Sequence, residues 1–174
     1  ISLGPIAAAA GGQGDGLSVF GTRTVTHVGV VVRDVEKVSK AWADVFDVEV
    51  SPITDTAHTR VAKVYFNTMT VEIEQPKAGP SPWRDFLDKH GEGIHHLAFD
   101  VADIDDHVKL LESKGGTRAL GEPEGTHGMV DLMRGFGLYF EPTETSTPTP
   151  LGTPGPPATR GMKDPARIGL MVSD

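Results

Sequence analysis

Two stretches of the chain repeat the same pattern of apolar and polar positions. Each opens with a run that predicts a strand, a β-branched, buried one at residues 25–32 and a second one at 96–101. An aspartate and apolar residues at helical spacing follow each run, which predicts a helix over 35–46 and a second one from Ile104 onward. Shorter strand-like runs complete each copy. The order strand–helix–strand–strand–strand is therefore expected twice.

Each predicted helix has one apolar face and recognisable ends. Asp34 and Asp103 are expected to cap the two N-termini, and Gly115-Gly116 to end the second helix. The apolar faces consist of Val35, Val38, Trp42 and Val45 in the first helix and of Ile104, Val108 and Leu111 in the second. Further strands are expected at 48–52, 61–66, 70–74, 117–120, 129–133 and 138–141, and a short helix within the connector that contains residues 81–90.

The two copies carry polar residues at one constant offset of 69 residues. The equivalent pairs are His27 with His96, Asp34 with Asp103, and Glu72 with Glu141. In each copy the aspartate follows the histidine by 7 residues and the glutamate follows it by 45. This spacing indicates one supersecondary unit used twice, and each copy supplies one imidazole and one carboxylate.

Side chains alternate between the two faces of a strand, so the directions of these four residues can be predicted. His27 and Gly29 lie opposite Val28 and Val30, and His96 and Ala98 lie opposite their apolar neighbours in the same way. The same alternation turns both glutamates away from the apolar face that packs on the helices. All four candidates are therefore expected on one concave face, where Gly29 and Ala98 leave room for a ligand.

Two histidines and two glutamates without any thiolate predict one octahedral divalent-metal site. The ligands would be His27, Glu72, His96 and Glu141, with one or two waters, and the ion would be Ni, Co, Mn, Fe or Zn. Glu74 shares a face with Glu72, but its repeat counterpart is Thr143, so Glu72 is preferred. His95 has no histidine counterpart and is interpreted as a packing or hydrogen-bonding residue on the opposite face.

Several other polar residues are weaker candidates for the site. Candidate general bases are Glu141, Asp55, His58 and His127. Tyr139 and Arg134 are candidate substrate-binding residues, because a phenol can donate a hydrogen bond and a guanidinium can bind a carboxylate. Each of these residue types is also common on ordinary protein surfaces.

Composition limits the class of protein. The 174 residues carry a net charge of −8, with 38% hydrophobic and 23% charged residues, which describes a globular protein without a nucleic-acid footprint. The expected partner is a small-molecule substrate, which would bind at the open positions of the predicted metal site. No apolar run approaches the roughly 20 residues that span a bilayer. The expected organisation is a flexible segment at 1–22, modules at 23–75 and 95–142, a linker at 76–94 and a Pro-rich tail at 143–174.

The two ends suggest processing and assembly. The chain starts at Ile1, so we expect that an upstream piece was removed, and the protein is either cytoplasmic or exported after loss of a signal. The proline-rich stretch at 142–158 is typical of an extended tail that lies over the surface or reaches to a partner subunit. A homodimer is therefore expected, with the site either between the two modules of one chain or across the dimer.

The repeat and its ligand pattern resemble the vicinal oxygen chelate superfamily, which includes glyoxalase I, methylmalonyl-CoA epimerase and extradiol dioxygenases. The resemblance covers residues 24–142. It is closest to the epimerase branch in S-P-W-R-D-F-L-D-K-H-G-E-G-I-H-H-L-A-F-D-V and in H-V-G-V-V-V-R-D-V. It implies an α+β fold of two tandem βαβββ modules that form a cleft around a metal, with His27, Glu72, His96 and Glu141 as ligands.

The chain departs from the epimerase branch at two places. Those epimerases usually carry Gln where this chain has Glu72, and a Glu there is similar to bacterial glyoxalase I. The stretch before Val61 lacks their catalytic Glu, and the second-module loop is shorter. The expected reaction is metal-assisted proton abstraction next to a carbonyl, by an epimerase, isomerase or lyase. The alternatives are an Fe(II) extradiol-type dioxygenase and a non-catalytic, resistance-type binding protein.

Overall fold

The predicted α+β fold with two βαβββ modules is confirmed. The computed structural model describes residues 24–66, 69–119, 129–131 and 138–143. The first module contains β1 (Thr24–Val31), α1 (Val35–Phe46), β2 (Thr54–Asp55), β3 (Thr59–Tyr65) and β4 (Thr70–Pro76). The second contains β5 (Gly93–Asp100), α3 (Ile104–Ser113), β6 (Thr117–Arg118), β7 (Val130–Asp131) and β8 (Tyr139–Thr143). The helix α2 (Pro82–His90) lies between them in the chain.

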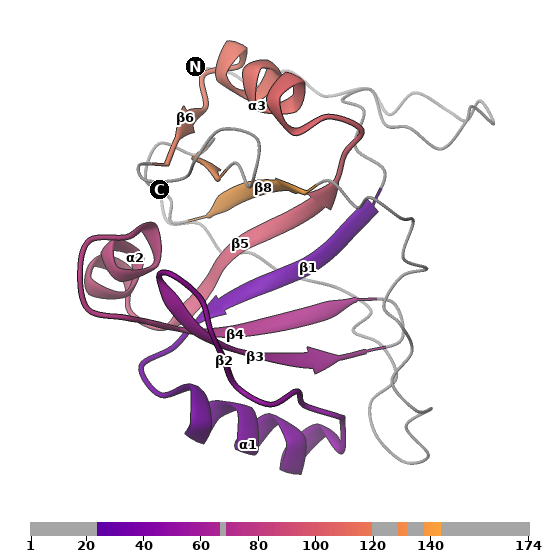
Figure 1. The fold of residues 1–174 in the computed structure, drawn as a ribbon, viewed down its shortest axis with the longest axis vertical. Coiled ribbons are helices and arrows are strands. Elements are labelled where there is room, and N and C mark those ends of the chain that lie inside the picture. Colours follow the sequence, from indigo (N-terminus) through magenta and orange to yellow (C-terminus); the bar gives the residue numbers. More distant parts are fainter. Residues whose placement is uncertain (1–23, 67–68, 120–128, 132–137, 144–174) are drawn as a thin grey trace, which may run out of the picture.

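All eight strands form one mixed sheet in the order β2-β3-β4-β1-β5-β8-β7-β6. Within each module the first strand pairs in parallel with the last, β1 with β4 and β5 with β8. The modules meet where β1 and β5 pair antiparallel at the middle of the sheet (Figure 1). The two halves are thus related by an approximate two-fold axis, and this chain joins them without a second copy. The homodimer stays a prediction.

The outer helices explain which face of the sheet is apolar. Helix α1 covers the first half of the sheet and α3 the second half, at opposite ends of the molecule (Figure 1). Val28, Val35 and Ile73 belong to the core cluster beneath α1, and Val101 and Val108 to the one beneath α3. Burying these side chains is the main driving force that holds each helix on its half-sheet. The opposite face of the central strands is left for the polar residues.

The ends of α1 and α3 are formed by the capping residues that the sequence predicts. The Asp34 carboxylate accepts a hydrogen bond from the Lys37 backbone N–H, and the Asp103 carboxylate accepts one from Asp106. Each aspartate therefore satisfies one of the free N–H groups at a helix N-terminus. After α3, Gly115 has a φ of +95°, a conformation that L side chains rarely adopt, so the predicted stop is confirmed.

The structure corrects two details of the first module. Val45 is 73% exposed, so it is not part of the apolar face of α1, and Phe46 packs against the core and against Trp42 instead. The strand expected at 48–52 is reduced to one isolated bridge between Val50 and Val64. Pro52 has no N–H for a strand ladder, and the edge strand forms two residues later as β2.

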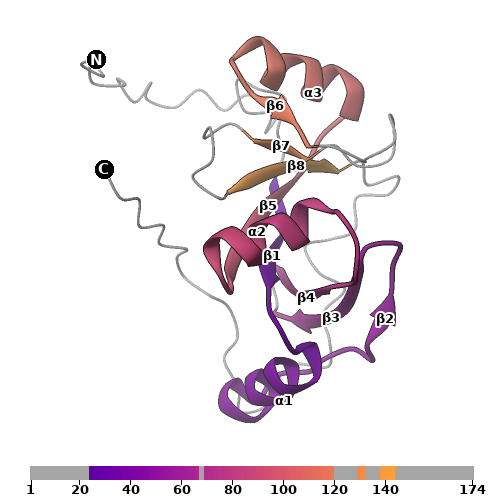
Figure 2. The ribbon, with the colours of Figure 1, turned by 90° about the vertical axis from the view of Figure 1, so that its left-hand side faces the viewer.

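The connector helix α2 packs on the site-facing side of the sheet. Its buried residues Trp83, Phe86 and Leu87 form a cluster with Val31 and Met129. Ser81 caps this helix by accepting from the Arg84 backbone N–H, and Pro82 occupies its first turn. Figure 2 shows α2 in front of the central strands. Among the helices of the described residues, none is long and apolar enough to cross a membrane.

Candidate metal centre

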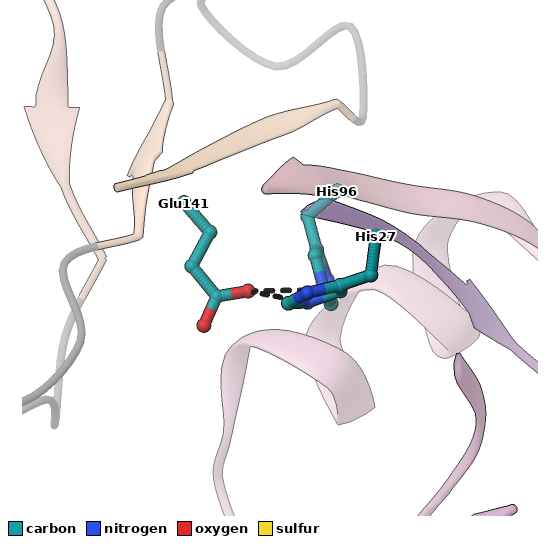
Figure 3. A group of neighbouring side chains, drawn as sticks. All are labelled: His27, His96 and Glu141. Atoms are coloured by element: carbon teal, nitrogen blue, oxygen red, sulfur yellow. Dashed lines mark hydrogen bonds and ion pairs between the residues drawn. The ribbon is translucent and has the colours of Figure 1, made fainter. Parts of the chain in front are cut away.

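Three of the four predicted ligands meet at one point. The Nε2 atoms of His27 and His96 are 3.2 Å apart. Glu141 Oε2 lies 3.0 Å from His96 Nε2 and 3.3 Å from His27 Nε2. Figure 3 shows the three side chains converging from β1, β5 and β8. The side chains are largely withdrawn from solvent, with 16%, 1% and 8% exposed for His27, His96 and Glu141.

These separations fit the donor set of a divalent metal ion. Two ligands that are each about 2.1 Å from a metal and at right angles to one another are about 3.0 Å apart. The three measured distances are close to that value. Among the described residues, His27, His96 and Glu141 form one of two groups whose nitrogen and oxygen atoms are close enough to hold an ion. Two imidazoles and one carboxylate suit first-row transition metals.

Glu72, the fourth predicted ligand, lies at the edge of this group. Its Oε2 is 4.0 Å from His27 Nε2, and its Oε1 is 2.7 Å from Lys63 Nζ. Lys63 stands directly across from Glu72 in the β3–β4 register, so the two side chains share a face. The structure therefore places Glu72 beside the other three, with one of its oxygens already paired to a lysine.

The register between β1 and β5 makes room for the two imidazoles. His27 stands opposite Ala98, and His96 stands opposite Gly29, so each histidine faces a small residue. A Cβ atom added to Gly29 would lie 2.0 Å from His96 Cε1. The prediction that Gly29 leaves room is thus refined: the His96 ring occupies that space.

His95 was expected on the opposite face, and this prediction is wrong. The β1–β5 register shifts between Gly29 and Val30, which leaves His95 as an extra residue in β5. Such a bulge breaks the alternation of side chains. The buried His95 ring stacks on Trp83, and its Nδ1 lies 2.9 Å from His96 Nδ1. A histidine that binds metal through one nitrogen usually has its other nitrogen held in this way.

Glu74 also approaches His96 from its outer side. Glu74 Oε2 accepts a hydrogen bond of 2.8 Å from the Trp83 indole N–H and lies 3.7 Å from His96 Nδ1. With His95 and His96 it forms the second group of close nitrogen and oxygen atoms. Strand alternation predicted the face of Glu74, but no pattern in the sequence predicted its pairing with Trp83. Burial and the neighbouring carboxylates raise the pKa of Glu74 well above its usual range.

The two site histidines differ in their readiness to hold a proton. Burial lowers the pKa of His96 to about 3, despite the favourable charge of Glu141. Burial also lowers the pKa of His27, but the hydrogen bond to Glu141 and the charges of Glu72 and Glu141 outweigh it, so the net pKa is raised. The pKa of His27 is therefore higher than that of His96, so His27 is the first of the two to take a proton as the pH falls. His96 stays neutral, the form that binds metal.

The metal centre opens into two adjoining cavities. One, of about 300 Å³, includes Thr26, Lys63 and Thr143 in its lining, and the other, of about 260 Å³, includes His58 and Met129. Both cavities are lined by Glu72, Glu74, Trp83 and Glu141, so they are parts of one cleft.

The weaker candidate residues differ in whether they line the cleft. His58 lines the cleft and stacks on Trp83, with ring centroids 5.9 Å apart. Asp55 is exposed and paired with Lys77 at 2.9 Å, which lowers the pKa of Asp55, and it does not line the cleft. Tyr139 is half-buried and lines a neighbouring cavity beside α2. His127 and Arg134 lie outside the described residues.

Known proteins resemble this chain in sequence and in fold. A sequence profile of the Glyoxalase/Bleomycin resistance protein/Dioxygenase superfamily matches residues 26–130. The mitochondrial methylmalonyl-CoA epimerase of Mus musculus is 32% identical over 109 residues, which cover 60% of this chain and 61% of that protein. The 2-epi-5-epi-valiolone epimerase of Actinomyces sp. is 26% identical over 125 residues, or 63% of this chain and 68% of that protein.

A solved structure shows the same fold. The crystal structure of methylmalonyl-CoA epimerase from Mycobacterium tuberculosis superposes with a TM-score of 0.61 at 21% sequence identity. The superposition covers 75% of this chain and 93% of that one. The paired-module architecture is therefore shared with a solved epimerase, while the mouse relative extends well beyond the part that this chain spans.

The first prediction concerns the ligands. The double substitution of His27 and His96 by Ala should abolish binding of Co(II) or Zn(II), because both imidazole donors are lost. Glu72→Gln should weaken binding much less, since Glu72 lies at the edge of the group. Isothermal titration with each metal and elemental analysis after dialysis measure this. Stoichiometric metal in the double variant would contradict the site.

The second prediction concerns the space opposite His96. Gly29→Ala should displace the His96 ring and lower the metal affinity at least about tenfold, the loss typical of a disturbed ligand orientation. Gly93→Ala is the matched control, because a Cβ there meets only Phe86 Cζ at 3.9 Å. Circular dichroism establishes that both variants fold, and metal titration compares them. Equal affinities for the two variants would contradict the proposed packing.

The third prediction concerns pH. Metal must displace the proton from His27, and the pKa of His27 is raised, so the apparent metal affinity should fall as the pH decreases through that pKa. The fall should begin at a higher pH than for an unperturbed imidazole. Competition titrations between about pH 8 and pH 5 measure it. A dissociation constant that stays constant across this range would contradict the assignment of His27 as a ligand.

Proposed function

Because this chain belongs to the Glyoxalase/Bleomycin resistance protein/Dioxygenase superfamily, we propose that it is a divalent-metal-dependent epimerase that moves a proton next to a carbonyl. The observation that carries the proposal is the convergence of His27 Nε2, His96 Nε2 and Glu141 Oε2 within 3.0–3.3 Å. Two relatives from different organisms are named epimerases, which supports the reaction class. The substrate would be a small molecule with two neighbouring oxygens.

The metal would be held by His27, His96 and Glu141, with Glu72 as a looser fourth ligand. When bound, such an ion withdraws charge from a carbonyl oxygen and so makes the neighbouring carbon more acidic. Glu72 is also paired with Lys63, so it would hold the ion less firmly than the other three ligands and would leave room for a chelating substrate. His96 is buried and contacts His95, so its neutral ring would keep its position while a substrate binds.

Glu141 is the proposed base. Its Oε2 contacts both histidines, and its carboxylate lines both parts of the cleft, so it reaches the space in which a substrate would bind. Inversion at carbon requires a second group that returns the proton to the opposite face. Of the described candidates, His58 lines the cleft and Asp55 does not, so we assign this second role to His58.

The Lys63–Glu72 pair favours a second candidate function, because it could keep Glu72 away from the ion. If Lys63 retains Glu72, the ion is held by two histidines and one carboxylate, the ligand set of non-haem Fe(II) oxygenases. An extradiol-type dioxygenase acting on a catechol is therefore the alternative. Loading the protein anaerobically with Fe(II) and following oxygen uptake with catechols distinguishes it from an epimerase.

The fourth prediction tests the proton transfer itself. Metal-loaded protein in D₂O should exchange the proton next to the carbonyl of methylmalonyl-CoA or 2-epi-5-epi-valiolone, the compounds in the names of its relatives. Glu141→Gln should reduce this exchange by about 100-fold or more, the usual contribution of a general base. Proton NMR measures the exchange.

The comparison is made at equal metal content, because a Gln oxygen can still coordinate. Glu112→Gln is the matched control, since Glu112 lies on α3 and pairs with Arg118 away from the cleft. Undiminished exchange in Glu141→Gln would refute Glu141 as the base. Tight binding of these compounds by wild-type protein without exchange or oxygen uptake would instead indicate a binding protein.

A further inference from the structure

Lys63 is a charged residue of the cleft that has no part in the proposed proton transfer. It lies in β3 directly across from Glu72, and its Nζ is 2.7 Å from Glu72 Oε1. Its side chain is 46% exposed and lines the cavity that contains His27, His96 and Glu141. Among the described residues that line the two parts of the cleft, Lys63 is the only Lys or Arg.

An ion pair with Glu72 does not account for a lysine at this position. A half-exposed lysine–carboxylate pair contributes little to stability, because water screens it and both side chains lose freedom. A lysine would also weaken a metal site by competing with the ion for Glu72. The ammonium group carries three N–H donors, and Glu72 is its one ion-pair partner among the described residues. Nζ can therefore donate to a ligand in the cavity while it keeps Glu72.

The charges around the cleft indicate what that ligand is. Three acidic side chains line it, those of Glu72, Glu74 and Glu141, and a bound divalent ion would offset the charge of two carboxylates. Lys63 supplies a positive charge in the same cavity, whose lining also includes Thr26 and Thr143. A negative group is therefore best accommodated beside Lys63, where the ammonium N–H groups can donate to it.

Resting on the proposed function, we propose that Lys63 binds a carboxylate that the substrate carries next to its two chelating oxygens. The substrate class is then a carboxylated carbonyl compound, not a neutral ketose. Lys63 acts as a specificity-determining residue in this assignment: it distinguishes substrates by charge.

Two small chelators that differ in one carboxylate test this proposal without requiring the substrate. Acetohydroxamate and malonomonohydroxamate both bind metals through neighbouring carbonyl and N–O oxygens, and only the second carries an additional carboxylate. Their dissociation constants are measured with Co(II)-loaded protein from the visible absorption of the ion. Wild-type protein should prefer the carboxylated probe, and Lys63→Met should reduce that preference about tenfold, the size of a charge-assisted hydrogen bond.

The ratio of the two dissociation constants reports the contribution of the carboxylate alone. Loss of the lysine charge affects the hydroxamate group equally in both probes, so that effect cancels in the ratio. Lys63→Arg should retain the preference, and Lys40→Met is the control, since Lys40 pairs with Asp44 on the exposed side of α1. An unchanged preference in Lys63→Met would overturn the proposal, as would equal binding of both probes by wild-type protein. Binding of neither probe would overturn the metal-centre proposal together with this one.

Discussion

The antiparallel join between β1 and β5 is the constraint on which the rest of this structure depends. It brings the first strands of the two modules into register, so that each histidine faces a residue too small to obstruct it. Parallel pairing within each module then places β4 and β8 on the two sides, with Glu72 and Glu141 directed toward the same centre. Neither module contains enough ligands alone. The donor set exists only because the two halves share a sheet.

Much of this arrangement could be predicted because it follows from two periodicities. The 69-residue offset related the ligands to one another, and alternation along the strands determined the face on which they lie. Asp34 and Asp103 were identifiable as caps because a short polar side chain before an apolar helix face has one common use. The vicinal oxygen chelate family was also predicted correctly, from the linker and the opening of β5.

The failures lie where tertiary contacts override local patterns. A bulge that no composition signals turned His95 toward Trp83, and the exposure of Val45 follows from how α1 sits on its half-sheet. Glu74 was expected as a possible substitute for Glu72, yet its carboxylate accepts from an indole 9 residues away in sequence. The pairing of Lys63 with Glu72 depends on strand register, which alternation alone does not supply. Asp55 was a candidate base only because its loop is polar, and the structure pairs it with Lys77 instead.

The approximate two-fold axis has a stereochemical consequence. A perfectly symmetric pair of histidines and glutamates would offer a substrate two equivalent binding directions, related by the axis. Lys63 and Glu74 of the first module, together with Trp83 of the connector helix α2, break this equivalence. Extending the β7–β8 register by one residue places the apolar Met129 across from Glu141, where module 1 has Lys63 across from Glu72. The residues that the duplication did not preserve therefore make the two binding directions unequal, and divergence between the two copies selects one of them.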